Sequence, residues 1–176
     1  DPSRVVGAHP IAGSEASGAG AARADLFARR LCILTPGPQT DPAALALLRA
    51  LWEGVGARVE AMPAATHDAI LARVSHLPHV VAYALVRALA SRTIDGRSIL
   101  DYAGSGLLDV TRIAASPAEI WRDIALTNRP ALAEALREFG VALDDLARLI
   151  ERGDAVGLER ALQDAARTRQ HLVGKA

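Results

Sequence analysis

Residues 65–89, ATHDAILARVSHLPHVVAYALVRAL, are apolar on almost every side of a helical projection, which is typical of a buried helix. Five polar side chains lie within this predicted helix: His67, Asp68, Ser75, His76 and His79. At 100° per residue, Asp68, Ser75 and His79 fall within roughly 40° of one another. Pro78 removes one backbone donor and predicts a kink beside His79. Because unpaired buried polar atoms cost ~1–3 kcal/mol each, this polar stripe indicates a ligand site.

The residues before this helix show short apolar runs separated by turn residues. The run RLCILT (30–35) predicts a strand buried on both faces. Asp41-Pro42 predicts a helix start with Asp as the N-cap, and residues 57–62 predict a second strand. Strand, helix and strand in this order are typical of an α/β unit with a parallel sheet. Upstream, we expect a strand at 4–8, a loop at 9–15 and a short helix within 16–28.

After Pro63 no convincing strand follows and helical patterns continue to the end of the chain. Ser-Pro-Ala-Glu at 116–119 forms a capping box and predicts a helix start. An apolar seam suited to helix pairing then runs through Leu132, Leu136, Phe139, Leu143, Leu146 and Ile150. Gly153-Asp154 ends this helix and caps the next. The shorter predicted features are a turn at 95–96, a flexible loop at 102–106 and a helix at 107–115.

The composition changes this picture little. Apolar residues make up 51% of the chain and charged residues 23%, and the formal net charge is zero, so nucleic acid is not expected as a partner. The single cysteine, Cys32, leaves no internal disulfide and fits a reducing compartment. We therefore expect a cytoplasmic protein. No membrane span is expected, because the most apolar stretch, 80–90, is too short and contains Arg87.

A few residues are candidates for chemistry. His9 follows a predicted strand, where active-site residues often lie, although loop histidines are often only exposed to solvent. Arg112 is either an ion-pair partner of Asp109 or a ligand for a carboxylate. His76 and His79 are three apart, but no acidic or cysteine ligand completes a set, so no metal site is expected. No GxGxxG follows a strand, so the dinucleotide fingerprint is absent from this chain.

Three segments together resemble the prephenate/arogenate dehydrogenase family of tyrosine biosynthesis. They are HPIAGSEASG (9–18), HDAILARVSHLPHVVAYAL (67–85) and YAGSGLLDVTRIAASPAEIWRDI (102–124). The resemblance implies a Rossmann domain for the nicotinamide cofactor, followed by an all-helical dimerisation domain similar to that of 6-phosphogluconate dehydrogenases. The expected fold class is therefore mostly α. Residues 1–63 would be the last strands and helices of the nucleotide-binding domain, and residues 64–176 the substrate-binding and dimerisation domain.

The resemblance also implies roles for individual residues. His9 would be the catalytic histidine, accepting the proton of the substrate's ring hydroxyl as hydride leaves for the cofactor. Arg112 would bind a substrate carboxylate, and His79 with Ser75 would line the substrate pocket. The other substrate-binding candidates are Ser14, Glu15, His67, Asp68 and Trp121. Leu107-Leu108 departs from the bulky aromatic and basic or polar residues of many members.

The sequence leaves several alternatives open. The expected activity is oxidative decarboxylation of prephenate to 4-hydroxyphenylpyruvate, or of arogenate to tyrosine, with NAD or NADP as hydride acceptor. The segment that carries the glycine fingerprint and an active-site serine is expected to be missing, so this chain alone is expected to be inactive. A non-catalytic helical dimerisation or ligand-binding module is a second hypothesis, and another β-hydroxyacid dehydrogenase is a third. Neither the choice of substrate and cofactor nor feedback inhibition by tyrosine follows from the sequence.

Overall fold

The computed structural model describes the whole chain except residues 13–17, 19, 21 and 174–176. The chain forms two compact units, Asp1–Val74 and Ser75–Ala176, and each is described by itself. The boundary between the two units falls within the long helical segment predicted from the sequence, and not at its start. The predicted domain boundary after Pro63 therefore stays a prediction.

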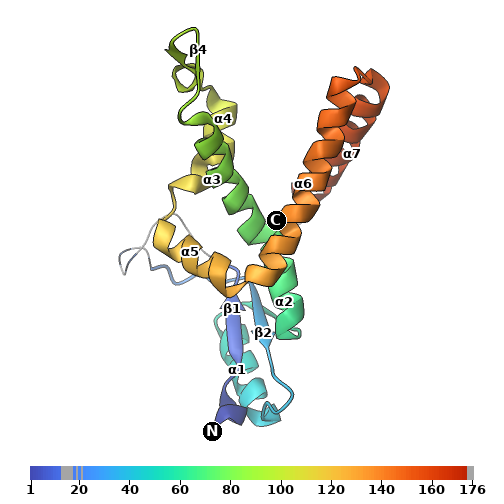
Figure 1. The fold of residues 1–176 in the computed structure, drawn as a ribbon. Helices are drawn as coiled ribbons and strands as arrows, with labels where there is room; N and C mark the ends of the chain where they lie inside the picture. The colour runs from blue at the N-terminus through green and yellow to red at the C-terminus, as the bar shows by residue number, and fades with distance from the viewer. Residues whose placement is uncertain (13–17, 19, 21, 174–176) are drawn as a thin grey trace. The chain divides into compact units, whose positions relative to one another are not determined.

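The first unit contains a three-stranded sheet in the order β1-β2-β3, and Figure 1 shows β1 beside β2. Its strands are β1 (Gly7–Pro10), β2 (Leu31–Thr35) and β3 (Arg58–Ala61). β2 and β3 are parallel, as the strand–helix–strand pattern predicts, whereas β1 pairs with β2 in the antiparallel sense. The prediction of a strand at 4–8 is wrong by about three residues, because Pro2–Arg4 forms a 3-10 turn capped by the Asp1 side chain. His9 consequently lies within a strand and not in the expected loop.

Helix α1 (Pro42–Gly54) packs against this sheet and encloses the core of the unit. Asp41 caps the helix as predicted, since its carboxylate accepts a hydrogen bond from the Ala43 N–H at 2.8 Å. Cys32 and Leu34 of β2 are fully buried, which confirms the predicted core strand. The partly buried side chains packed around them are Phe27, Leu45, Leu48, Trp52 and Val59.

Among the described residues of 16–28, Gly20 is in a 3-10 conformation and residues 24–28 form turns, so the predicted short helix is not found over residues 22–28. Backbone bonds link Leu26 to Arg23 and Ala28 to Asp25 as separate turns. Arg29 has a φ of 62°, a left-handed conformation that ends any helical continuation. Local turn geometry therefore overrides the alanine-rich composition.

The long helical segment consists of α2 (Ala64–Leu71), a π-helical turn (Ala72–His76) and α3 (Leu77–Leu89). The π turn lies directly before Pro78, whose missing N–H and ring bulk disturb the preceding hydrogen bonds. The spacing of 100° per residue does not hold across this π turn. The prediction that Asp68, Ser75 and His79 share one face of the helix used that spacing, so its geometric basis is wrong.

The expectation that this segment is buried is not met within the single chain. Val74 is 68% exposed and Ile70 is 41% exposed. Residues 64–89 also form one helix long and apolar enough to cross a membrane, with a mean hydropathy of 1.4 over its best window. Core helices of soluble proteins pass the same test, so the finding does not separate the two settings.

In the second unit, α3 is followed by a small hairpin of β4 (Thr93–Ile94) and β5 (Arg97–Ser98). Asp95 and Gly96 have φ values of 50° and 73° and make the tight turn between the strands. This hairpin corrects the expectation that no strand follows Pro63. The turn itself was predicted from the Asp-Gly pair.

Short helices follow the hairpin. They are the 3-10 helix η4 (Ile99–Tyr102), α4 (Ser105–Thr111) and the 3-10 helix η5 (Arg112–Ala115). Helix α4 starts inside the segment predicted as a loop, and α3 packs against both α4 and η5. The expected single helix at 107–115 is therefore two helices that join at Arg112.

Three longer helices complete the unit: α5 (Ala118–Thr127), α6 (Arg129–Glu151) and α7 (Ala155–Val173). The predicted capping box is wrong, since Pro117 is the N-cap of α5 and no side chain bonds there. The predicted cap of α7 is confirmed, because the Asp154 carboxylate accepts from the Gly157 N–H at 2.9 Å. Gly153, with a φ of 63°, supplies the left-handed turn that ends the preceding helix.

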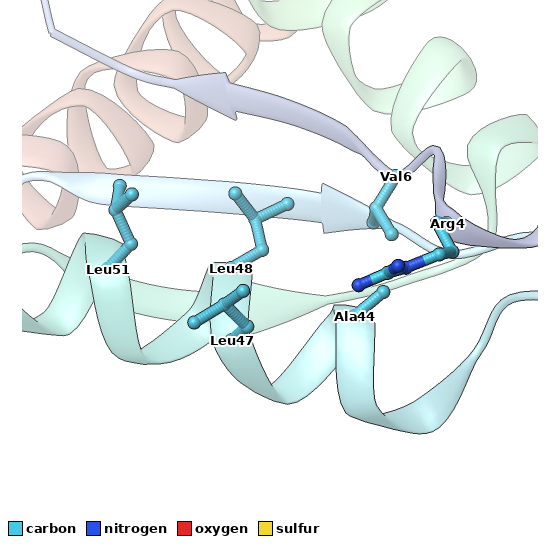
Figure 2. A pocket seen from close by; sticks show the side chains of 6 residues that line it. All are labelled: Arg4, Val6, Ala44, Leu47, Leu48 and Leu51. Atoms are coloured by element: carbon cyan, nitrogen blue, oxygen red, sulfur yellow. The ribbon is translucent and has the colours of Figure 1, made fainter.

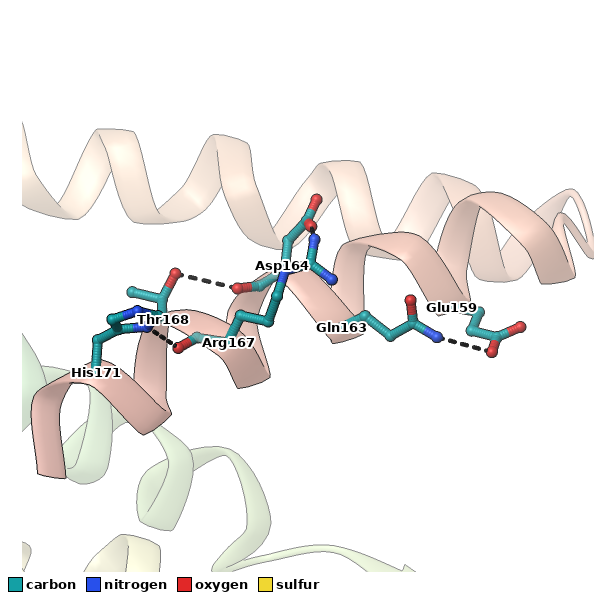
Figure 3. Close-up of polar contacts among 6 residues, drawn as sticks. All are labelled: Glu159, Gln163, Asp164, Arg167, Thr168 and His171. Carbon is teal, nitrogen blue, oxygen red and sulfur yellow. Dashed lines mark hydrogen bonds and ion pairs between the residues drawn. The ribbon is translucent and has the colours of Figure 1, made fainter. Parts of the chain in front are cut away.

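Helices α6 and α7 pack together and leave much of their apolar surface open. Leu132 is 4% exposed, but farther along the predicted seam Leu143 is 55% exposed and Ile150 is 63% exposed. Polar contacts one helical turn apart run along α7 (Figure 3). They join Glu159 to Gln163, Asp164 to Arg167 and Thr168, and Arg167 to His171.

Candidate functional site

His9 is held by the antiparallel pairing of β1 with β2, where it lies opposite Ile33. Gly7 starts the strand, and a Cβ atom at that position would collide with Thr35 Oγ1. The absence of a side chain at Gly7 therefore lets β1 lie close to the buried strand β2. This pairing ties the backbone of His9 to the core of the first unit.

Helix α2 brings a second histidine to His9. His9 Nδ1 lies 2.8 Å from His67 Nε2, and the two rings meet edge to face with centroids 5.1 Å apart. His67 Nδ1 lies 2.8 Å from Asp68 Oδ1. We call His9, His67 and Asp68 the histidine chain. It lies entirely within the first unit, whose helix α2 packs against β2.

The electrostatics of the histidine chain favour a neutral His9. Partial desolvation lowers the pKa of His9 from its ordinary value of 6.5, and the neighbouring His67 lowers this pKa further. A histidine with a lowered pKa is mostly unprotonated at neutral pH, so it can accept a proton. The arrangement fits a general base.

If His9 is the base, kcat/KM should fall as the pH decreases through a value below 6.5. The sign follows because only the neutral ring accepts a proton, and desolvation and His67 both extend the neutral range downward. Of the described groups, His67 is the one whose side chain contacts the His9 ring, and Asp68 contacts His67 in turn. A kcat/KM profile against pH measures this limb, and an acid limb centred above 6.5 would contradict the assignment.

The second unit contains a separate cluster around Trp121. The ring of His79 stacks on Trp121 with centroids 3.5 Å apart and planes 17° apart. His79 Nδ1 donates to the Ser75 carbonyl oxygen at 3.0 Å, which fixes the ring along the helix. We call Ser75, His79 and Trp121 the tryptophan cluster. Its remaining ring nitrogen, Nε2 of His79, is the atom that this geometry leaves for a ligand.

Two polar contacts that the sequence did not reveal support the tryptophan cluster. Tyr83 OH donates to the Ser116 carbonyl oxygen at 2.7 Å, which ties α3 to the start of α5. The Asn128 amide lies 3.3 Å from His76 Nδ1, and the His76 ring meets Trp121 edge to face. A tyrosine on α3 and an asparagine between α5 and α6 carry no pattern that marks such contacts in advance.

The sequence-predicted site residues thus fall into two groups. The histidine chain unites His9, His67 and Asp68, and the tryptophan cluster unites Ser75, His79 and Trp121. Arg112 begins η5 in the second unit. Ser14 and Glu15 lie outside the described residues. The role predicted for each of these residues stays a prediction.

The first unit also has a cavity of about 280 Å³ (Figure 2). It is lined by Arg4, Val6, Ala44, Leu47, Leu48 and Leu51. Figure 2 shows the Arg4 side chain extending toward Ala44 of α1. No candidate residue lines this cavity, so it adds nothing to the site.

The chain matches two neighbouring family descriptions. Residues 2–61 match "Prephenate dehydrogenase, nucleotide-binding domain", and residues 63–164 match "Prephenate dehydrogenase, dimerization domain". The chain therefore belongs to the prephenate dehydrogenase family. This finding confirms the resemblance inferred from the sequence, and with it the expected fold class of a Rossmann remnant followed by a helical domain.

Individual proteins agree with the family match. The cyclohexadienyl dehydrogenase of Zymomonas mobilis is 37% identical over 169 residues, covering 96% of this chain and 58% of the relative. The prephenate dehydrogenase of Bacillus subtilis is 36% identical over 173 residues, covering 97% of this chain and 47% of the relative. The chain spans about half the length of the curated relatives that it matches.

Solved structures give the same result. The prephenate dehydrogenase of A. aeolicus in complex with hydroxyphenyl propionate and NAD+ has a TM-score of 0.90 and 39% identity, covering 95% of this chain and 58% of that chain. The Synechocystis arogenate dehydrogenase has a TM-score of 0.85 and 33% identity, covering 95% of this chain and 61% of that chain.

Proposed function

We propose that this chain is part of a dehydrogenase that oxidatively decarboxylates prephenate or arogenate, with hydride transfer to NAD or NADP, in tyrosine biosynthesis. The observation that carries the proposal is the contact of His9 with His67, because His9 has a lowered pKa and lies in the part of this chain that matches a prephenate dehydrogenase nucleotide-binding domain. A purely structural helical module has no need of such a base. The names of the relatives support both substrates.

In the proposed reaction, His9 removes the proton of the ring hydroxyl while the carbon that bears it is oxidised. The ring carboxylate leaves as carbon dioxide, and the electrons of its C–C bond complete the aromatic ring. His9 then returns the proton to the phenolic oxygen, so no net proton remains on the protein. Bound NAD or NADP accepts the hydride.

The βα turn at the start of α1 does not form the phosphate site of a dinucleotide. This turn leads from Thr35 to α1, and the carboxylate of Asp41 already caps that helix. A second βα turn leads from Ala61 of β3 to α2, whose N-cap is Pro63. A pyrophosphate at a helix N-terminus needs free N–H groups and no fixed anion beside them. We therefore assign no residue at the start of α1 to cofactor phosphates. The proposal that NAD or NADP is the cofactor rests on the family and on the NAD+ complex of the A. aeolicus protein.

Substrate recognition is assigned to groups of the second unit. Arg112 would pair with a substrate carboxylate, for which a guanidinium offers two parallel donors. The tryptophan cluster would bind the substrate side chain, with His79 fixed by Ser75 and stacked on Trp121. Ser14, Glu15, His67 and Asp68 remain predicted substrate contacts.

The direct test uses the full-length product of the gene from which this chain comes. Prephenate and arogenate are each supplied with NAD and with NADP, and both reduced cofactor and carbon dioxide are measured. Equal amounts of the two products are expected with at least one substrate and cofactor pair. Tight substrate binding without turnover in any of the four mixtures would favour the non-catalytic module instead. Turnover of an unrelated β-hydroxyacid alone would favour the third hypothesis.

We further propose that the chain forms a homodimer through its helical unit. The family match over residues 63–164, which is to a dimerization domain, supports this proposal. A shallow apolar groove of about 520 Å³ runs along α7 between Leu158, Leu162 and Ala166. Exposed apolar surface on this scale is typical of an interface between copies.

Leu162→Asp is expected to convert the dimer to a monomer, because a carboxylate at a side chain that is now 55% exposed would be buried unpaired at the interface. Arg160→Asp is the matched control, since it places the same acid on the opposite face of α7. Analytical ultracentrifugation of both variants over a range of concentrations measures the dissociation constant. Equal dissociation constants for the two variants would place the interface elsewhere.

We also propose a cytoplasmic location without membrane or nucleic-acid partners. The support is the buried, unpaired thiol of Cys32 and the neutral net charge. In this proposal residues 64–89 are a core helix of the dimer and not a membrane span. Flotation of the protein with lipid vesicles would contradict it.

A further inference from the structure

The contacts of the histidine chain indicate which ring nitrogens carry a proton and which accept one. A carboxylate only accepts hydrogen bonds, so the 2.8 Å contact of Asp68 with His67 requires a proton on His67 Nδ1. A neutral imidazole carries one N–H, which leaves Nε2 of His67 as an acceptor. With His67 neutral, the 2.8 Å contact between the rings places the proton of His9 on Nδ1, whereas a doubly protonated His67 would donate to His9 instead. The lone pair of His9 consequently lies on Nε2, at the opposite side of the ring.

We propose that His67 and Asp68 are positioning residues that hold His9 in the tautomer whose Nε2 accepts the proton of the substrate. The inference deepens the proposed function and rests on it only for the identity of that substrate. The two residues act through His9 and do not themselves touch the reacting atoms. When His9 takes up the proton, its Nδ1–H still has an acceptor in His67, which in turn is oriented by Asp68.

The burial of His67 fits this role better than the predicted substrate contact. Its side chain is 18% exposed, whereas that of Asp68 is 53% exposed and remains solvated. Both ring nitrogens of His67 already have a partner, one in His9 and one in Asp68. No ring nitrogen of His67 is left to bind a substrate group.

The position of His67 is itself fixed by the fold. It lies in the first turn of α2, where its N–H donates to the Pro63 carbonyl oxygen at 3.1 Å. Helix α2 packs against β2, the strand that pairs with β1 and thus with His9. The helix start and the strand register together hold the two rings in contact.

The first test reads the tautomers directly in the 176-residue chain. Long-range proton–nitrogen correlation spectra of the histidine rings are expected to show His9 protonated on Nδ1 and unprotonated on Nε2 near neutral pH. His67→Ala removes the acceptor, so His9 is expected to become a mixture of both tautomers. His171→Ala is the matched control, because His171 bonds only to its own helix among the described residues. A His9 ring protonated on Nε2, or one unchanged by His67→Ala, would overturn the proposal.

The second test compares two substitutions of similar size in the full-length protein. The Oε1 atom of Gln is placed much as Nε2 of histidine, so His67→Gln keeps an acceptor for His9 while His67→Leu removes it. We expect kcat to fall by about 10–100-fold in His67→Leu, as on loss of other outer-shell partners, with KM little changed. His67→Gln is expected to recover most of this loss. Equal kcat values for the two variants, or a loss confined to KM, would contradict a positioning role.

The two tests separate the inference from the proposed function. If the wild-type full-length protein turns over neither prephenate nor arogenate, the proposed function fails. The tautomer of His9 and its response to His67→Ala still decide whether the histidine chain orients His9. If turnover is found but the tautomer is the opposite one, the function stands and the positioning role falls.

Discussion

Replacing His9 by asparagine is expected to lower kcat by ~10²–10⁴-fold, the usual contribution of a positioned general base. The substitution is chosen because the Asn amide can take the place of Nδ1 and still donate to His67 Nε2. It has no atom in place of Nε2, the nitrogen that accepts the substrate proton. The histidine chain is therefore kept in contact while its reactive atom is removed.

The measurement is steady-state turnover of the full-length protein, with KM as a second readout. KM is expected to change little, because His9 acts on the proton in transit and the carboxylates of the substrate are bound elsewhere. His171→Asn is the matched control, an exposed histidine on α7 that bonds to the Arg167 carbonyl oxygen. If His9→Asn and His171→Asn have the same kcat, His9 is not the base. The proposed mechanism would then lose its proton acceptor.

The strand–helix–strand core of the first unit follows directly from local sequence signals. The apolar run at 31–35, the Asp41 cap and the apolar face of α1 each specify an element without reference to distant residues. β2 and β3 are then parallel because a helix joins them. Leu51 of α1 and Val55 directly after it are apolar but nevertheless 56% and 45% exposed. A periodic apolar pattern shows which face of a helix is apolar, but it does not show which element, if any, covers that face.

The features that the sequence did not predict depend on contacts between distant segments or on small backbone changes. His9 and His67 are 58 positions apart, and only the pairing of β1 with β2 and the packing of α2 bring their rings together. The π turn at 72–76 changes the helical phase without any residue that marks it clearly except Pro78. The hairpin of β4 and β5 consists of two-residue strands, too short to give an alternating pattern.

The candidate site itself was predicted by resemblance more than by spacing. Periodicity placed Asp68 on a face with Ser75 and His79, whereas the contacts place Asp68 on His67. The resemblance named all three members of the histidine chain but gave His67 and Asp68 a substrate role. The hydrogen bonds favour the positioning role that we propose for His67, because an imidazole with both nitrogens engaged has no further polar atom to offer.

Replacing Leu34 by alanine is expected to destabilise the first unit by ~2–5 kcal/mol, the usual cost of a large-to-small change in a core. Leu34 is fully buried on β2, between α1 and the sheet. Leu47→Ala is the matched control, since Leu47 lies on the same unit but is 69% exposed. Its effect is expected to stay within about 0.5 kcal/mol, as for most surface substitutions.

Unfolding of the first unit can be followed separately through Trp52, which packs edge to face on Phe27 in this core with centroids 5.1 Å apart. The chain has two tryptophans, so both variants are made in a Trp121→Phe background and measured by fluorescence in urea. Below the unfolding transition, Leu34→Ala is expected to keep the His9 tautomer, because strand pairing persists as long as the unit is folded. The Leu34 and His9 substitutions should therefore separate stability from chemistry. A urea midpoint for Leu34→Ala equal to that of Leu47→Ala would mean that β2 is not the core of the unit.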